Sequence, residues 1–96
     1  MSFHFEWDPE KARSNKLKHE VSFEEGQAVF YDEHAIYIAD PDYDGGEERF
    51  LLLGMSLKPR VLVVCHCYRK KGASIRIISA REATRREQGQ YWGHNL

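Results

Sequence analysis

Arginine is the residue type that offers the clearest chemistry in the second half of the sequence. The planar guanidinium group binds two phosphate oxygens at once, and it can stabilise negative charge that builds at a scissile phosphate. Several arginines at one edge of a sheet would therefore hold an RNA backbone. The alternative is an ordinary solvated basic strand and helix, and composition alone does not decide between the two. The arginines of the last two predicted strands and of the helix after them are Arg69, Arg76, Arg81, Arg85 and Arg86.

Histidine and glutamate supply the candidates for acid–base chemistry near neutral pH. His19 ends a predicted helix, so it is either a cation that stabilises the helix end or an acid–base group. His66 lies in an apolar strand pattern, where a buried core histidine and a catalyst are both open interpretations. Glu48, beside Arg49 at the start of another strand, is either a base or part of a structural ion pair.

The metal and nucleotide motifs that carry chemistry in many enzymes are absent from the sequence. It contains no His-x-x-x-His, no Cys-x-x-Cys and no glycine-rich phosphate loop, which argues against a metal enzyme or a nucleotide hydrolase. Cys65 and Cys67 lie on the same side of one predicted strand, so we expect reduced, packed thiols rather than a disulfide or a metal site. We expect no metal and no cofactor.

Charge is distributed unevenly although the net charge is only −1. Residues 1–48 hold thirteen of the fifteen acids and four bases, a charge of −9, whereas residues 49–96 hold ten bases and two acids, a charge of +8. Such asymmetry indicates either a polyanionic partner for the basic half or neutralisation of one half by the other within the fold.

The elements that must position these residues form a single α+β domain over residues 1–96. We expect a small antiparallel sheet of about four strands, two N-terminal helices and a C-terminal basic helix, with the helices on one sheet face and the other face open to solvent or a partner. Alternating aromatic residues at Phe3, Phe5 and Trp7 add a short strand or extended arm. Capping and turn signals place the helices at 9–19, 23 to about 30 and 80–90, and the strands at 35–39, 50–56, 61–68 and 74–79.

Strand periodicity limits which of these side chains can share a surface. Arg69 has the same parity as Cys65 and Cys67, and His66 has the opposite parity. Counted in the same way, Arg76 lies opposite Ile75 and Ile77, so the arginines need not all face one side. With no apolar run long enough to span a membrane and no N-terminal secretory pattern, we expect a cytoplasmic protein without a membrane partner.

Taken together, the motifs of the chain resemble those of the BrnT toxin family over nearly the whole length. Phe5-Glu6-Trp7-Asp8, Lys18-His19, Glu47-Glu48-Arg49-Phe50, Arg60-Val61-Leu62-Val63-Val64 and Ile75-Arg76-Ile77-Ile78-Ser79-Ala80-Arg81 occur in the family's order and spacing. The sequence departs from many members at Tyr43-Asp44, where they carry His-Ser, and at Gly26, where they carry Ala.

This resemblance implies a RelE-like fold and the toxin of a type II toxin–antitoxin pair, a ribonuclease that blocks translation. It also implies a ribbon-helix-helix antitoxin of the BrnA type. The antitoxin would bind operator DNA, and the toxin would be associated with that DNA only through the antitoxin.

Our leading hypothesis is a metal-independent endoribonuclease, because the 2′-hydroxyl of RNA supplies the nucleophile. It needs a base, an acid and cationic stabilisation. We assign phosphate binding and charge stabilisation to Arg69, Arg76 and Arg81. The acid–base candidates are His19, Glu48 and His66. Further substrate-binding candidates are Lys16, Lys18, Arg49 and Arg85. The alternative is a non-catalytic binding module whose basic face holds an acidic partner or nucleic acid.

Overall fold

A computed structural model of the chain describes residues 3–41, 45–46 and 48–95. The first helix, α1 (Pro9–His19), has the predicted limits. The Asp8 side chain accepts a hydrogen bond from the Glu10 N–H at 2.9 Å. Pro9 lies in the first turn, where a backbone N–H would have no partner within the helix, so its missing N–H costs nothing. The helix stops because Glu20 adopts the left-handed backbone conformation, with φ of 58°.

The second helical segment also begins where the sequence predicts. α2 (Phe23–Gln27) continues into the 3-10 helix η1 (Ala28–Tyr31), and the Ser22 hydroxyl caps it by accepting from the Glu25 N–H at 3.0 Å. The Glu25 carboxylate does not complete a capping box, because it pairs instead with the Arg60 guanidinium.

The described residues form a five-stranded sheet in the order β1-β5-β4-β3-β2. Four of these strands are the predicted antiparallel meander, and the N-terminal aromatic segment adds a fifth as an edge strand parallel to β5. The strands are β1 (Phe5–Glu6), β2 (Ile36–Ile38), β3 (Phe50–Met55), β4 (Val61–Arg69) and β5 (Ser74–Glu82). A short 3-10 turn, η2 (Lys70–Gly72), joins β4 to β5.

The predicted start of the last helix is wrong. β5 continues to Glu82, which pairs with Leu62, so Arg81 belongs to a strand and not to a helix. The helix α3 (Arg85–His94) starts only after Thr84, whose hydroxyl accepts from the Glu87 N–H while the Glu87 carboxylate accepts from the Thr84 N–H. Pairing with β4 therefore overrides the local helical preference of Ala80 and Arg81.

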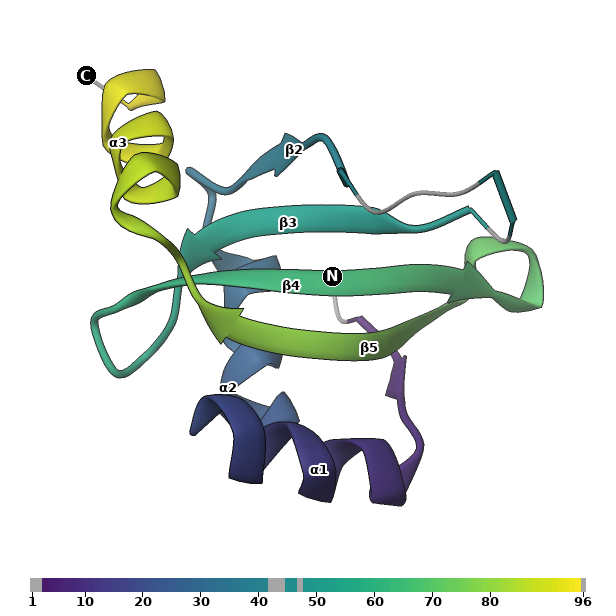
Figure 1. Cartoon of the computed structure of the whole chain (residues 1–96). Coiled ribbons are helices and arrows are strands. Elements are labelled where there is room, and N and C mark those ends of the chain that lie inside the picture. The colour runs from purple at the N-terminus through teal and green to yellow at the C-terminus, as the bar shows by residue number, and fades with distance from the viewer. Residues whose placement is uncertain (1–2, 42–44, 47, 96) are drawn as a thin grey trace.

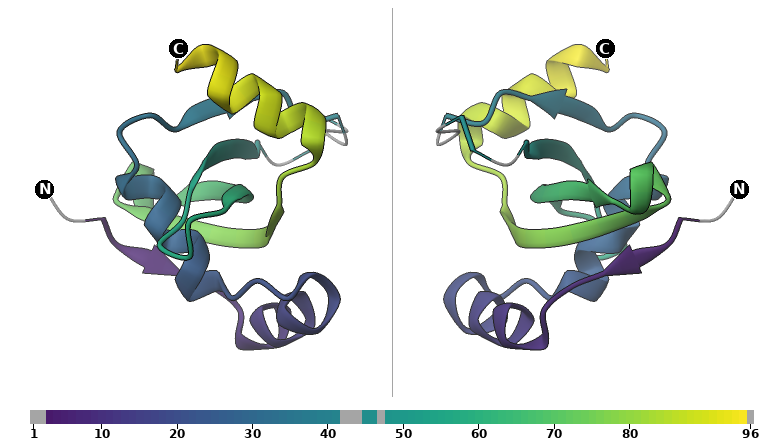
Figure 2. Two further views of the ribbon diagram at one scale, coloured as in Figure 1. Left: turned by 90° about the vertical axis from the view of Figure 1, so that its left-hand side faces the viewer. Right: turned by 90° about the vertical axis from the view of Figure 1, so that its right-hand side faces the viewer.

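The helices occupy both faces of the sheet rather than one. α2 and η1 pack on the face that carries Leu52, Leu62 and Val64, whereas Tyr91 of α3 packs with Leu51, Leu53 and Val63 on the opposite face. α1 runs alongside β5 (Figure 1). Figure 2 shows α3 and α1 at opposite sides of the sheet. The face that carries α3 is called the α3 face below.

Every helix in the described part of the chain is too short or too polar to cross a membrane.

Candidate functional site

A β-bulge in β5 brings the predicted phosphate-binding arginines onto one face. Cys65 pairs with Ser79 and the next residue, His66, pairs with Ile77, so Ile78 is an extra residue on β5. Such a residue reverses the alternation of side chains along its strand. As a result Arg76 and Arg81 face the same side of the sheet, although simple parity predicts opposite sides.

The register shows which side this is. Side chains of directly paired residues lie on the same face of a sheet. Arg81 pairs with Val63, Arg76 with Cys67, and Arg69 with Ser74, and Val63 belongs to the core cluster that contacts α3. All three arginines therefore belong to the α3 face. They are spread along it, because Val63 and Arg69 are six residues apart, about 20 Å at strand spacing.

His19 lies at the Arg81 end of this face. The side-chain amide of Asn15, one turn earlier, is hydrogen-bonded to Ala80 on β5, which fixes the C-terminal turn of α1 against that strand. Burial lowers the pKa of His19, and the nearby charges of Lys18 and Arg81 lower it further. The imidazole is therefore neutral at neutral pH and able to accept a proton.

Two surface hollows meet at His19. The larger, of about 430 Å³, is lined by charged residues of both signs: Lys16, His19, Glu20, Lys58, Arg60 and Glu82. In the smaller, of about 200 Å³, every charged residue is basic, and its lining is Lys11, Ser14, Asn15, Lys18, His19, Ile78 and Ser79. A neutral base beside a cationic hollow is the arrangement that cleavage of a phosphodiester needs.

Arg81 is held in place by α3. Its two terminal nitrogens donate to the two oxygens of Glu87 at 2.8 and 2.9 Å, a bidentate ion pair. The hydrogen bonds from Arg81 lower the pKa of Glu87 to about 2 despite partial burial. Arg76 is tied in a similar way to Glu6 of β1 at 2.9 Å, and Glu6 also accepts from the Ser74 hydroxyl.

Among the remaining surface candidates, Lys16 and Lys18 line the hollows at His19, and the others lie elsewhere. Glu48 precedes β3 and lines a hollow with Phe50, Tyr68 and Arg69, at the end of the sheet far from His19. Arg49 forms an ion pair with Asp40 at 3.3 Å. Lys16, Lys18 and Arg85 are exposed, the last in the first turn of α3. Tyr43-Asp44 and Glu47 lie outside the described residues.

His66 is fully buried and faces away from the arginines. It packs edge-on against Phe30, with ring centroids 4.7 Å apart, on the face covered by α2 and η1. Its Nδ1 lies 3.1 Å from the Val64 carbonyl oxygen, and its Nε2 has no hydrogen-bond partner among the described groups. Burial lowers the pKa of His66, so the ring is neutral.

Arg60 is a site residue that analysis of the sequence did not single out. It donates to Glu25 at 2.7 and 2.8 Å and to the Glu20 carbonyl at 3.0 Å, and thereby joins α1, α2 and the start of β4. The Lys58-Pro59-Arg60 turn shows only a local bend, and nothing in the sequence pairs it with a glutamate 35 residues away. Among the described residues, no three His, Cys, Asp or Glu side chains lie close enough to hold a metal ion.

Comparison with known proteins places these features in a family. A protein-family model described as the ribonuclease toxin BrnT of type II toxin–antitoxin systems matches residues 7–87. The 1.1 Å crystal structure of the Brucella abortus ribonuclease toxin BrnT has a similar fold, with a TM-score of 0.66 and 17% sequence identity. The match covers 88% of this chain and 100% of the Brucella chain. No curated protein sequence matches.

Proposed function

Since the chain belongs to the BrnT family of ribonuclease toxins, we propose that it is an endoribonuclease that cuts RNA without a metal ion and so inhibits translation. The observation that carries the proposal is the position of His19, a neutral imidazole beside Lys18 and Arg81 at the rim of a cationic hollow. We further propose that a ribbon-helix-helix antitoxin of the BrnA type neutralises it in the cytoplasm and alone contacts operator DNA.

The proposed reaction uses the nucleophile that RNA itself carries. His19 accepts the proton of the 2′-hydroxyl, the 2′-oxygen attacks phosphorus, and the bond to the 5′-oxygen breaks as that oxygen takes a proton from solvent. Arg81 and Lys18 stabilise the charge on the non-bridging oxygens of the transition state. The lowered pKa of His19 suits the step, since a base must be unprotonated before it can act.

The other candidates receive roles according to their positions. Arg76 and Arg69 continue the α3 face away from His19, so we assign them to phosphates further along the strand, together with Arg49. Lys16 and Arg85 are exposed cations for the same polyanion. We assign the base to His19 and not to Glu48 or His66, because Glu48 lies at the far end of the sheet and His66 is buried under the opposite face.

The test is cleavage of an end-labelled RNA by antitoxin-free protein with EDTA present. We expect cleavage by the wild type and a loss of about 100-fold or more in His19→Gln, the usual effect of removing a general base. His94→Gln is a matched control, because His94 also ends a helix but is exposed at the end of α3. Protein that neither cuts RNA nor arrests growth would refute the ribonuclease.

A non-catalytic binding module remains the second candidate because Arg76 and Arg81 already pair with Glu6 and Glu87. A neighbouring gene for a small ribbon-helix-helix protein would favour the toxin. Expression with and without that neighbour separates the two, since a toxin is tolerated only in the presence of its antitoxin.

A further inference from the structure

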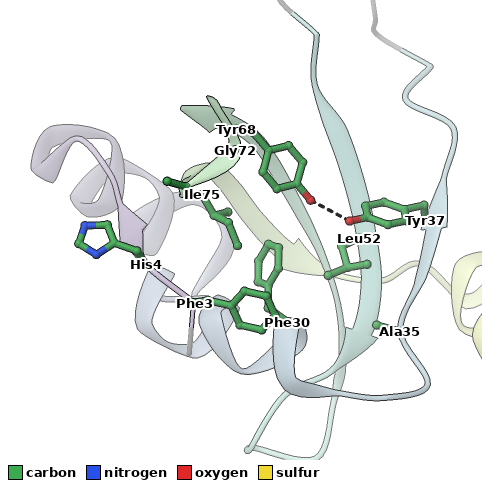
Figure 3. Close-up of a pocket in the computed structure, with 10 residues that line it drawn as sticks. Phe3, His4, Phe30, Ala35, Tyr37, Leu52, Tyr68, Gly72 and Ile75 are labelled. Carbon is green, nitrogen blue, oxygen red and sulfur yellow. Dashed lines mark hydrogen bonds between the residues drawn. The ribbon is translucent and has the colours of Figure 1, made fainter. Parts of the chain in front are cut away.

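An aromatic pocket lies on the sheet face opposite the arginines, at the end near η2. Its volume is about 380 Å³, at the lower end of the range for small-ligand sites. Figure 3 shows Tyr37 and Tyr68 joined through their hydroxyls on one side of it, with Phe3 and Phe30 on the other. Tyr37 comes from β2, Tyr68 from β4 and Phe30 from η1, so the walls belong to three separate elements.

The two tyrosines are not ordinary core residues. Tyr37 is 60% exposed and Tyr68 is 40% exposed, and yet their hydroxyl oxygens lie 2.8 Å apart. One hydroxyl donates in this pair, so the hydrogen of the other points elsewhere and can be donated to a ligand. Burial and the Tyr37 hydroxyl raise the pKa of Tyr68, which keeps its hydroxyl protonated.

Further aromatic rings pack against the walls of the pocket. The ring of buried His66 packs edge-on against Tyr68 and Phe30, with ring centroids 5.4 and 4.7 Å apart, and the ring centroid of Phe50 lies 5.4 Å from that of Tyr68. A ring that entered beside Tyr68 would therefore meet aromatic surfaces already held in position, and it would lose little free energy in ordering them.

Two lysines come immediately before pocket-lining residues in the chain. Gly72 and Ala73 line the pocket, and Lys70 and Lys71, both exposed, lie just before them in η2. His4 also lines the pocket, and none of its ten lining residues is acidic. Proteins bind single-stranded nucleic acid with aromatic rings that stack on the bases and with nearby cations that contact the phosphates.

We propose that this pocket is a subsite for one unpaired nucleobase of the RNA substrate, stacked on Tyr68 and hydrogen-bonded by the tyrosine pair. The inference rests on the proposed function. Tyr68 is five residues along β4 from Val63, the partner of Arg81, about 17 Å, so the base held here belongs to a nucleotide remote from the scissile bond. The subsite would add affinity and base preference without taking part in the chemistry.

The experiment measures RNA binding apart from cleavage. A single-stranded 2′-O-methyl RNA of about ten nucleotides cannot be cut, because it lacks the nucleophile, and its affinity is measured by fluorescence anisotropy. We expect Tyr68→Ala to weaken binding at least about fivefold, the lower end of the effect of losing one stacking ring. Tyr37→Ala, a change on an exposed edge strand, should also weaken binding, and it keeps the test open if Tyr68→Ala unfolds.

Two comparisons locate the effect. Trp92→Ala removes an aromatic ring of α3 that is 52% exposed and lies outside the pocket, and it should leave the affinity unchanged. In NMR titrations with each of the four ribonucleoside 5′-monophosphates, we expect the amide signals of Gly72, Ala73 and Ile75 to shift and saturate.

The outcomes separate this inference from the proposed function. Normal RNA affinity in both folded tyrosine variants would overturn the subsite while leaving cleavage at His19 intact. Loss of antitoxin affinity with normal RNA affinity would make the pocket a contact for the antitoxin and would overturn the subsite equally. Tyrosine-dependent binding by a protein that never cuts RNA would support the subsite and refute the ribonuclease.

Discussion

The side-chain amide of Asn15 on α1 pairs with both backbone groups of Ala80 on β5, as a neighbouring strand would. Its Nδ2 donates to the Ala80 carbonyl at 2.8 Å, and its Oδ1 accepts from the Ala80 N–H at 3.1 Å. The Nδ2 also donates to the Val21 carbonyl at 2.9 Å, and the residue is only 7% exposed. The helix that carries His19 is thus fixed to the strand that carries Arg81.

Asn15→Ala should therefore destabilise the fold strongly. It leaves three buried backbone groups without this partner, and we expect a loss of about 3 kcal/mol in the free energy of unfolding. Urea denaturation measures the loss. Ser14→Ala, an exposed neighbour on the same helix, should change stability by less than about 0.5 kcal/mol. Equal stability of the two variants would show that the amide is not needed.

On the acid side of the pH–rate profile, the rate of RNA cleavage should fall as His19 becomes protonated. Burial is the main cause that lowers the pKa of His19 below 6.5, and the charges of Lys18 and Arg81 lower it further. Activity should therefore persist below the pH at which an ordinary histidine becomes charged. Lys18→Gln removes one of these charges, and the acid limb should move to higher pH together with the His19 signal in an NMR titration. Arg13→Gln, in an exposed pair with Glu10, is the control. If Lys18→Gln moves the NMR titration but leaves the acid limb in place, another group is the base.

The ion pair of Arg81 with Glu87 should stabilise the protein in a pH-dependent way. The folded-state pKa of Glu87 is about 2 and its ordinary value is 4.5. The stabilisation is therefore present above about pH 4.5 and is lost as the pH falls towards 2. Because the Arg81 side chain is 35% exposed, we expect about 1–2 kcal/mol and not the full electrostatic value.

Glu87→Gln tests this pair. The variant should be less stable than the wild type near pH 7, and the two should converge as the pH approaches 2, as followed by thermal unfolding. Glu10→Gln breaks the exposed pair with Arg13 and should have little effect at any pH. A difference between Glu87→Gln and the wild type that does not change with pH would contradict the assignment.

Two buried glycines should respond oppositely to alanine. At Gly26 in α2 a Cβ atom would lie 3.4 Å from the Ala80 Cβ, an ordinary contact, and alanine should stabilise the helix by about 0.5–1 kcal/mol. At Gly54 in β3 it would lie 2.9 Å from a Val29 methyl group and 3.0 Å from the Ala35 Cβ. Overpacking there should cost about 1–3 kcal/mol. Denaturant midpoints of the two variants should shift in opposite directions; shifts of the same sign would contradict this packing.

Local signals predict the first half of the fold well. Asp8-Pro9 and Ser22 determine their helix ends through contacts within a few residues, so the sequence locates both. The apolar, β-branched run from Val61 likewise predicts β4. The helix assigned to Ala80 and Arg81 fails because their conformation depends on pairing with β4, which no local pattern records.

The candidate site is predictable in composition but not in geometry. Residue types suggested His19 and the arginines, but the bulge at Ile78 decides that Arg76 and Arg81 share a face, and parity counting cannot detect an extra residue. The pairing of Arg60 with Glu25 and of Asn15 with Ala80 joins segments 35 and 65 residues apart. Such contacts depend on the tertiary fold, so a sequence pattern does not reveal them.

The place of β5 between β1 and β4 determines when the candidate site can form during synthesis. β1 and α1 are translated before β5, the strand on which both rest, and before Glu87, the residue that orients Arg81. Contacts between such distant segments form late and slowly. A nascent chain therefore carries His19 without its cationic partner, and the candidate site is completed only after β5 and Glu87 have left the ribosome.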